Sequence, residues 1–391
     1  MLRYLTAGES HGRGCFAILD GFPAGLHIQP DDINFWLAER QKGYGRGGRQ
    51  RIEKDEVDML AGVRGGYTLG GPILMAVWNR DFKNWTDAMD PWKPSTGPRA
   101  VKVVQPRPGH ADLVGAIKYE QDDCRNILER ASARETSARV AAGALCRKLL
   151  AEFGVDLAGH VIQIGPVIAK TDKVPSQDIR KLSMKSQVRC CDKEAGANMV
   201  AVIKDCKRKK DSVGGVVETR VWGLPLGLGT FTQWDRKLDA RIAQAMMSIQ
   251  AVKGVEVGIG FRGANRFGSK YHDEIIREEK ARVGGKYRRL TNNLGGTEGS
   301  MSTGEDMIVR VAKKPISTLM KPLRTVNIET LEPALAVLER SDTCAVPALA
   351  IIVEASIAIV LAEFFIEKFG GDTVAEMKRN FDSYVAETNK R

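Results

Sequence analysis

The sequence predicts a soluble globular protein that contains both helices and strands. Its 391 residues can bury a large core, as one big domain or as two ordinary ones. Hydrophobic residues make up 43% of the chain and charged residues 27%, which is typical of a folded protein and not of a disordered one. Helical and strand-like patterns both occur, and no obvious internal repeat or low-complexity linker marks a domain boundary. We therefore expect a mixed α and β fold.

Two helices are predicted in the first half of the chain. The first opens at Pro30, carries Ile33 and Leu37 on one face, and runs to about Gln41, with Gly43 as its stop. The second should begin near residue 132 and run to about residue 153. Apolar residues recur along it at helical spacing while its arginines and lysines turn outward. These apolar residues are Ala138, Ala141, Leu145 and Leu149.

Strands and further helices are predicted in the second half. Residues 213–221 and 255–260 are predicted to be strands, and residues 238–249 between them a helix with alanine, methionine and isoleucine facing inward. The most apolar segment, residues 345–366, is interrupted by Pro347, Glu354 and Glu363. We interpret it as a buried segment leading into a core helix and not as a membrane span.

Two segments, residues 170–195 and residues 262–293, are predicted to be polar insertions, and we assign the second no role. The basic run KDCKRKKD, residues 204–211, could contact nucleic acid. Such runs are more often solvated turns, which is the interpretation we prefer.

The overall charge favours anionic partners. The formal net charge is +11 and the pI is near 9.3. This positive charge would attract and steer anions, but it does not indicate which anion binds. The first residues contain no apolar stretch long enough for a signal peptide. The seven cysteines form no C-x-x-C pair, and Cys190 and Cys191 are adjacent. These features predict a cytoplasmic protein with free thiols.

The stretch QKGYGRGGRQR, residues 41–51, places four cations among four glycines. These cations are Lys42, Arg46, Arg49 and Arg51. The stretch could be an RNA-binding loop or a solvated turn. It could also be a mobile clamp, on a solvent-reaching loop, that closes over a small and multiply charged metabolite.

Two of the five histidines stand in turns flanked by glycine. Ser10 and His11 lie in GESHG, residues 8–12, and His110 follows a Pro-Gly turn in PRPGHADLVG, where a backbone can approach a ligand closely. A structural role is the more common one for a histidine in a turn. Neither histidine has metal-ligand spacing, so we expect no zinc site. No third partner or nucleophile elbow marks a Ser-His triad.

RASARET, residues 130–136, opens the long predicted helix. Ser132 is expected to cap it, with Glu135 completing a capping box. The N–H groups of a helix N-terminus together with Arg134 would also make an anion site.

Three further stretches carry weaker signals. NNLGGTEGSMSTG, residues 292–304, is a glycine loop without a Walker lysine. KKPIST, residues 313–318, offers Lys314 and Thr318 as a grip on one phosphate. RSDT, residues 340–343, sets Arg340 two positions from Asp342.

Taken in order, these motifs make the chain resemble the chorismate synthase family nearly end to end. GESHG is similar to the family's first signature, RASARETSARVAAGAL to its second and RSDTCAVPALAIIVEAS to its third. RPGHADLVGAIKY, DSVGGVVE, SIQAVKGVEVGIG and KKPIST also resemble family segments. Ser341 stands where the third signature often has histidine, and Ser300 and Thr303 depart from the usual glycine loop.

The resemblance implies a fold and a reaction. The fold is a single large α+β domain, residues 1–391, with helices sandwiched between antiparallel β-sheets and assembled as a homotetramer. The reaction is the last step of the shikimate pathway, which leads to aromatic amino acids: 5-enolpyruvylshikimate 3-phosphate loses phosphate and a ring proton in a 1,4-anti elimination that gives chorismate. Reduced FMN is required although the reaction is redox-neutral.

The resemblance also implies roles for single residues. His11 is expected near the phosphate with Ser10 beside it, His110 at the flavin, and Asp342 as the base or proton relay. The substrate carries two carboxylates and a phosphate, which the planar forks of arginine suit. The expected substrate-binding residues are Arg40, Arg46, Arg49, Arg134 and Arg340.

For FMN the resemblance implies residues in several motifs: Arg130, Ala131, Ser132, Gln250, Ala251, Gly299, Lys314, Pro315, Ile316, Ser317, Thr318 and Arg340. The other two implied cofactor-binding residues, Arg40 and Arg46, are the positions linked with NADPH in family members that have two activities. We expect NADPH to serve only as an indirect source of reduced flavin, because no extra reductase segment is visible.

Two other classes of function would also account for single features of the sequence. A basic RNA-binding protein would explain the charge and the glycine-arginine loop, but aromatic residues are only 6% and no stacking arrangement is evident. A flavin reductase would explain FMN, but no dinucleotide fingerprint occurs. We expect no nucleic-acid partner and no membrane.

Overall fold

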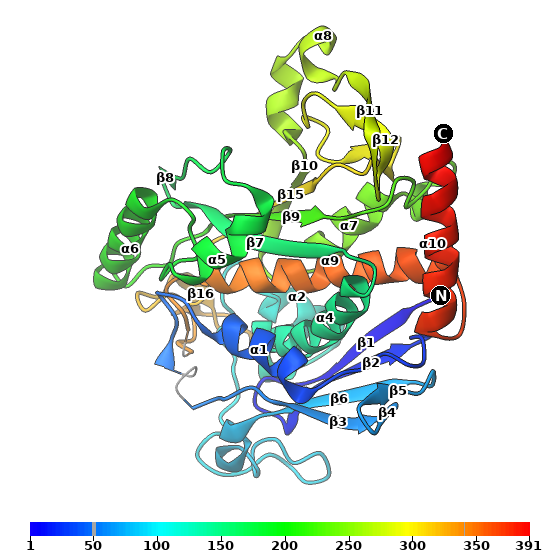
Figure 1. Ribbon diagram of the computed structural model, residues 1–391. Coiled ribbons are helices and arrows are strands. Elements are labelled where there is room, and N and C mark those ends of the chain that lie inside the picture. The colour runs from blue at the N-terminus through cyan, green and yellow to red at the C-terminus, as the bar shows by residue number, and fades with distance from the viewer. Residues whose placement is uncertain (49–51, 340) are drawn as a thin grey trace.

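The computed structural model describes residues 1–48, 52–339 and 341–391, and two antiparallel sheets in it enclose a layer of helices (Figure 1). The first sheet has the order β1-β2-β6-β3 and the second the order β10-β15-β9-β7-β8. The strands of the first are β1 (Arg3–Gly8), β2 (Gly14–Asp20), β3 (Val57–Ala61) and β6 (Ile73–Trp78). Those of the second are β7 (Asp156–Ile164), β8 (Val167–Ile168), β9 (Gly215–Trp222), β10 (Val252–Val257) and β15 (Met307–Lys313).

The helices between the sheets are α1 (Pro30–Gln41), α4 (Thr136–Ala151), α7 (Leu238–Met247) and α9 (Val346–Phe369). Helix α4 packs on β2 and β6, α9 packs on β7 and β9, and the two helices pack on each other. One hydrophobic core therefore runs through both sheets and the helical layer. The sandwich that the family resemblance implied is confirmed.

The remaining elements surround this core. The outer helices are α2 (Asp112–Lys118), α3 (Arg125–Ala131), α5 (Ser176–Met184), α6 (Lys193–Arg208), α8 (Gly268–Tyr271) and α10 (Val374–Lys390). Two-stranded ribbons pair β4 (Val63–Arg64) with β5 (Tyr67–Thr68), β11 (Ile275–Arg282) with β12 (Gly285–Arg289), β13 (Thr297–Glu298) with β14 (Met301–Ser302), and β16 (Arg324–Val326) with β17 (Pro333–Leu335). Short 3-10 turns are η2 (Arg80–Asn84), η3 (Ala133–Glu135), η4 (Trp234–Arg236) and η5 (Gly260–Asn265).

Helix α9 is the centre of the helical layer. It is the one helix of the described chain that is long and apolar enough to span a bilayer, but 83% of its most apolar window is buried inside the protein. Even Glu354 is buried, because Arg147 and the Gly159 N–H pair with its carboxylate. The prediction of a core helix in this segment is confirmed.

The predicted elements recur with shifted ends. Helix α1 has its predicted bounds, and α7, β9 and β10 overlap their predicted segments. The two polar segments are more structured than expected, because 170–195 contains α5 and 262–293 contains the β11–β12 ribbon, which stands away from the sandwich (Figure 1). The basic run 204–211 is mostly the last turns of α6 and not a separate turn.

The capping box predicted at residue 132 is wrong. Ser132 Oγ accepts from the Arg134 N–H and caps the short turn η3, after which α4 begins at Thr136. The Glu135 carboxylate instead accepts from Thr6 Oγ1 and from Gln250 Nε2. It therefore ties the start of the long helix to β1 and to the turn before β10.

Candidate active site

One cleft of about 550 Å³ brings together motifs that lie far apart in the sequence. Its walls come from the turn after β1, the loop after α1, the segment before α2, the turn between α3 and α4, the residues around the ends of β10 and β15, and the start of α9. Most of the predicted site residues line it: Ser10, His11, Arg40, Arg46, His110, Ala131, Ser132, Arg134, Gln250, Ala251, Lys314, Ile316, Ser317, Thr318 and Asp342.

Other predicted residues lie outside this lining. The exposed Arg130 guanidinium donates to the Thr6 and Gly8 carbonyls, at 2.9 and 3.2 Å. Gly299 lies in the turn between β13 and β14, and Pro315 lies within the lining segment without lining it. Arg49 and Arg340 are outside the described residues, so their substrate and flavin roles stay predictions.

Two of the cleft arginines share one buried carboxylate. Asp55 accepts from Arg40 Nη2 at 2.5 Å and from Arg134 Nη1 at 2.6 Å. Burial opposes ionisation of Asp55, but the two guanidinium charges outweigh it and hold the pKa of Asp55 below its usual value. Arg134 Nε also donates to Asn79 Oδ1, and Arg40 Nη1 donates to Thr136 Oγ1. Both guanidinium groups are therefore fixed in place at the cleft wall.

The glycine-rich loop is packed against the segment that precedes α9. Arg46 Nη1 lies 2.8 Å from Asp342 Oδ2, and the Gly47 N–H donates to Asp342 Oδ1 at 2.6 Å. A Cβ on Gly45 would lie 3.0 Å from the Cys344 side chain, so this glycine permits a close approach. The Arg46 side chain is only 10% exposed, so our expectation of a solvent-reaching position is wrong for this residue.

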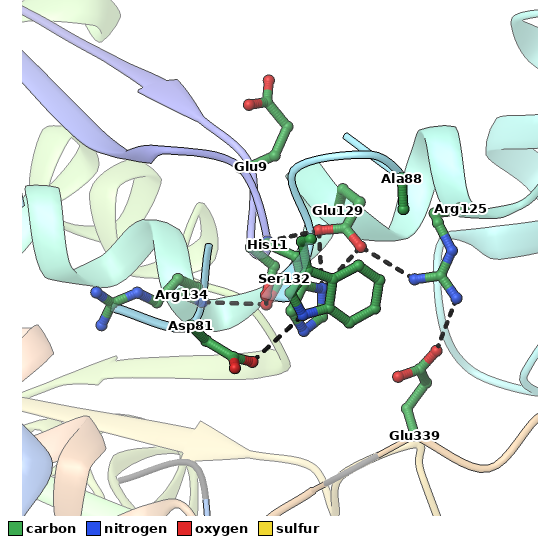
Figure 2. Close-up of polar contacts among 12 residues, drawn as sticks. Glu9, His11, Asp81, Ala88, Arg125, Glu129, Ser132, Arg134 and Glu339 are labelled. Atoms are coloured by element: carbon green, nitrogen blue, oxygen red, sulfur yellow. Dashed lines mark hydrogen bonds and ion pairs between the residues drawn. The ribbon is translucent and has the colours of Figure 1, made fainter. Parts of the chain in front are cut away.

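His11 is enclosed by a carboxylate and an indole. Its Nδ1 lies 2.8 Å from Glu129 Oε1 (Figure 2). Its ring stacks on Trp85 with centroids 4.0 Å apart. Arg125 bridges Glu129 and Glu339, at 3.2 and 3.4 Å. Ser132 Oγ donates to Ser10 Oγ at 3.2 Å. The first two signature motifs thus meet at Ser10, next to His11.

His110 belongs to a second polar cluster. Its Nδ1 lies 2.5 Å from Asp112 Oδ1, and Arg107 binds the same carboxylate through Nε and Nη2. Burial opposes ionisation of Asp112, but His110 and Arg107 outweigh it and hold the pKa of Asp112 well below its usual value. Arg107 Nη1 also donates to Thr318 Oγ1 at 3.0 Å. The His110 turn is thereby joined to the KKPIST segment.

Two adjacent lysines stand where β15 ends, with Lys313 as its last residue and Lys314 directly after it. Lys314 Nζ donates to the Gly109 carbonyl at 2.7 Å and to Ser317 Oγ at 2.9 Å. Lys313 Nζ donates to the Gln250 carbonyl at 2.9 Å. Burial, and then repulsion by Arg46, lower the pKa of Lys313 to about 8, although Asp342 acts in the opposite direction.

The lining is cationic. Within the described part of the chain, six lysines and arginines line the cleft against three carboxylates, those of Glu53, Glu339 and Asp342. Asp55, Asp112 and Glu129 lie behind the lining, where each supports an arginine or a histidine. Such a cleft is suited to a ligand with several negative charges.

Several of these residues were missed by sequence reasoning. None of Asp55, Trp85, Arg107, Asp112, Glu129 and Lys313 was named as a site residue. The sequence does offer a signal for two of them. Asp112 lies two residues after His110 in PRPGHADLVG, and Lys313 directly precedes Lys314 in KKPIST. Asp55 and Trp85 carry no local signal that distinguishes them from ordinary polar and aromatic residues.

Comparisons with known proteins point to one family. The family model for chorismate synthase matches residues 2–366. Relatives named chorismate synthase include that of Geobacter metallireducens, 52% identical, and that of Bacillus subtilis, 51% identical, each alignment covering 98% of both chains. A crystal structure of chorismate synthase matches with a TM-score of 0.80 at 42% identity, over 100% of this chain and 99% of the other.

Proposed function

Because this chain belongs to the chorismate synthase family, we propose that the cationic cleft is the site at which it forms chorismate. Family membership makes the protein a lyase of the shikimate pathway, which serves aromatic amino acid biosynthesis. The observation that carries the proposed location is the convergence of three signature segments and two histidines on one cleft. Neither an RNA-binding protein nor a flavin reductase is supported by the relatives.

The substrate proposed for the cleft is 5-enolpyruvylshikimate 3-phosphate. Arg40, Arg46 and Arg134 present guanidinium groups to the cleft, whose lining also contains His11. Charge-assisted hydrogen bonds from such groups match carboxylates and phosphate in geometry and charge. Because Asp55 already fixes two of these arginines, little side-chain freedom is lost when the substrate binds.

The residues present also fit reduced FMN. Ala345, Ala348 and Ile352 give the cleft an apolar wall at the start of α9. Gln250 Oε1 and Arg46 Nε are buried polar atoms without a partner in the described structure. Lys314, Ser317 and Thr318 would hold the phosphate. When bound, reduced flavin would supply an electron transiently so that the C–O bond breaks, and would recover it afterwards.

Protein side chains would donate and accept the protons that the elimination requires. Phosphate departs with the electron pair of the C–O bond and a ring proton is lost, so the site needs an acid and a base. His11 would hold a proton near the departing phosphate, while the arginines neutralise its oxygens. Asp342 would accept the ring proton or relay it, with Arg46 as its counterion. His110, backed by Asp112 and Arg107, would balance the negative charge of the reduced flavin.

We further propose a cytoplasmic homotetramer that takes its flavin already reduced. Several large apolar side chains are exposed on the isolated chain, among them Trp92 at 91%, Phe267 at 87% and Trp234 at 80%. Association would cover such surface. Sedimentation of the purified protein at a mass near four chains would support the tetramer, and a monomer would contradict it.

The proposed function is tested by an anaerobic assay. Purified protein, substrate and chemically reduced FMN are mixed, and chorismate is followed by its absorbance. We expect turnover with reduced FMN and none with oxidised FMN or with NADPH alone. Absence of chorismate under the first condition would contradict the proposed function. Robust turnover with NADPH alone would contradict only the external source of reduced flavin.

A further inference from the structure

Glu129, in the last turn of α3, holds the Ser10–His11 turn through its main chain and its carboxylate. Its main-chain carbonyl accepts from the Ser10 N–H at 2.9 Å, and its Oε2 accepts from the His11 N–H at 2.8 Å. His11 Nδ1 lies 2.8 Å from Oε1 and 3.1 Å from Oε2 of the same carboxylate (Figure 2). One residue thus fixes both the backbone and the ring of His11, from a position 118 residues away in the sequence.

The flat face of the His11 ring is also fixed. The imidazole and the Trp85 indole are stacked, with an angle of 22° between their planes. Trp85 Nε1 donates to Asp81 Oδ2 at 3.3 Å, and the Arg99 guanidinium lies 4.8 Å from the Trp85 ring centroid. The indole is therefore held from its edge and its face, and it restricts rotation of the imidazole.

Glu129 itself is kept ionised. Burial opposes ionisation, but the contacts with His11, and then the charge of Arg125, hold the pKa of Glu129 below its usual value. The Glu129 side chain is only 3% exposed, and Arg125 Nη1 lies 3.2 Å from its Oε1. A carboxylate accepts and does not donate, so Nδ1 of His11 must carry the proton of this contact.

We propose that Glu129 is the positioning residue of His11, holding a proton on Nδ1 so that Nε2 is the atom that exchanges a proton with the substrate phosphate. Glu129 acts through His11 and does not line the cleft. In other histidine–carboxylate pairs the partner sets the tautomer in the same way, and the wrong tautomer is costly to catalysis. This inference rests on the proposed function for the role of Nε2, but the tautomer itself does not depend on it.

The charged groups around His11 come from several elements. Glu129 and Arg125 are on α3, Asp81 is on η2, and Arg99 reaches the site over Trp85. Glu339 lies behind Arg125. Among these groups, Glu129 is the one whose printed contact reaches the His11 ring nitrogen, at 2.8 Å from Nδ1.

Two variants separate charge from shape. Glu129→Gln keeps the size of the side chain but removes the charge and replaces one acceptor oxygen with an NH₂ donor. Facing the ring, that NH₂ group would drive Nδ1 toward the acceptor role. Glu129→Asp keeps the charge on a shorter stem. Glu354→Gln is the matched control, because Glu354 is also a buried carboxylate paired with an arginine but lies outside the cleft lining.

The first readout does not need activity. ¹⁵N NMR of histidine-labelled protein gives the tautomer of each of the five histidines, because protonated and unprotonated ring nitrogens have distinct chemical shifts. We expect His11 to carry its proton on Nδ1 in the wild type and in Glu129→Asp, and to change toward the Nε2–H form in Glu129→Gln, whose NH₂ group can donate to Nδ1. The wild-type tautomer of His11 should persist in Glu354→Gln. The other four histidines serve as internal references.

The second readout is the anaerobic assay with reduced FMN. Glu129→Gln should lower kcat on the order of tenfold to a thousandfold with a small change in KM, and Glu129→Asp should restore most of the loss. An unchanged His11 tautomer in Glu129→Gln would overturn the inference whether or not the wild type is active. A wild type that forms no chorismate, with the tautomer changed as expected in the variant, would instead overturn the proposed function and leave the His11–Glu129 pairing standing.

Discussion

Arg46 and Asp342 form an ion pair across the cleft, with Nη1 2.8 Å from Oδ2. The pair joins the glycine-rich loop to the segment that leads into α9, and the Gly47 N–H reinforces it. Burial lowers the pKa of Arg46, while Asp342 works in the opposite direction. One carboxylate therefore ties Arg46 and Gly47 to the segment before α9.

Arg46→Ala should weaken both the substrate complex and the fold. Hydrogen bonds to charged groups contribute roughly 1.5–3 kcal/mol each, so substrate affinity should fall about ten- to a hundredfold or more. The melting temperature should also fall, because Asp342 loses its counterion. Calorimetry with substrate and a thermal melt measure the two effects. Lys42→Ala, in the same loop but exposed, is the control that should change neither much. Unaltered affinity in Arg46→Ala would remove this arginine from the binding site.

His110→Ala should lower turnover on the order of 10²–10⁴ while substrate binding changes little. Its ring is held by Asp112 and Arg107 and lines the cleft, which suits a group that balances charge on the flavin. Steady-state kinetics with reduced FMN, paired with substrate calorimetry, separate the two quantities. Near-normal turnover would return His110 to a purely structural role in its Pro-Gly turn.

Lys313 should make anion binding depend on pH. Its pKa of about 8 lies below the ordinary 10.5, so affinity for an anionic ligand should fall as pH rises through about 8 and the ammonium loses its proton. The free energy of unfolding changes in the opposite direction and rises with pH in this range. Between about pH 8 and 10.5 the unfolded chain keeps a proton that the folded chain has released, so Lys313 adds stability as pH rises.

The check is substrate affinity at pH 7 and pH 9 in wild type and Lys313→Met. At pH 7 the variant should bind the substrate more weakly than the wild type does. Its substrate affinity should also differ less between pH 7 and pH 9. Equal pH dependence in both proteins would show that another group controls it.

Asp55→Asn should destabilise the protein by about 3–5 kcal/mol, because two buried arginines would lose their shared counterion. The pKa of Asp55 is lowered in the fold, so its contribution is present above its unfolded pKa and is lost as pH falls through the folded value. Denaturant unfolding at pH 7 and at pH 3 should therefore show a larger difference between wild type and variant at pH 7. The same difference at both values would contradict the assignment.

Local signals explain why much of the fold could be predicted. Pro30 and the aspartates after it mark the start of α1, and the long apolar run of α9 has no competing interpretation once its proline and glutamates are noticed. The capping of α4 could not be predicted, because Glu135 bonds to Thr6 and Gln250, which are 129 and 115 residues away. The Glu135 carboxylate makes these two tertiary contacts and does not form the local capping box.

The candidate site divides in the same way. His11 and His110 stand in glycine-flanked turns that attract notice in the sequence, and the arginines lie in motifs that resemble one family. Asp55 and Glu129 act only through partners that the fold brings near, so no spacing in the sequence reveals them. The glycines of the 41–48 loop suggested mobility, whereas Gly45 allows close packing on Cys344.

The most direct measurement is a crystal structure of the protein with substrate and oxidised FMN bound. The account predicts both molecules in the cleft of about 550 Å³, with the substrate phosphate within hydrogen-bond distance of His11 Nε2 and its anionic groups on Arg46 and Arg134. It also predicts the flavin phosphate at Lys314 and Thr318. Substrate bound at another surface, or in this cleft with its phosphate turned away from His11 and the arginines, would contradict it.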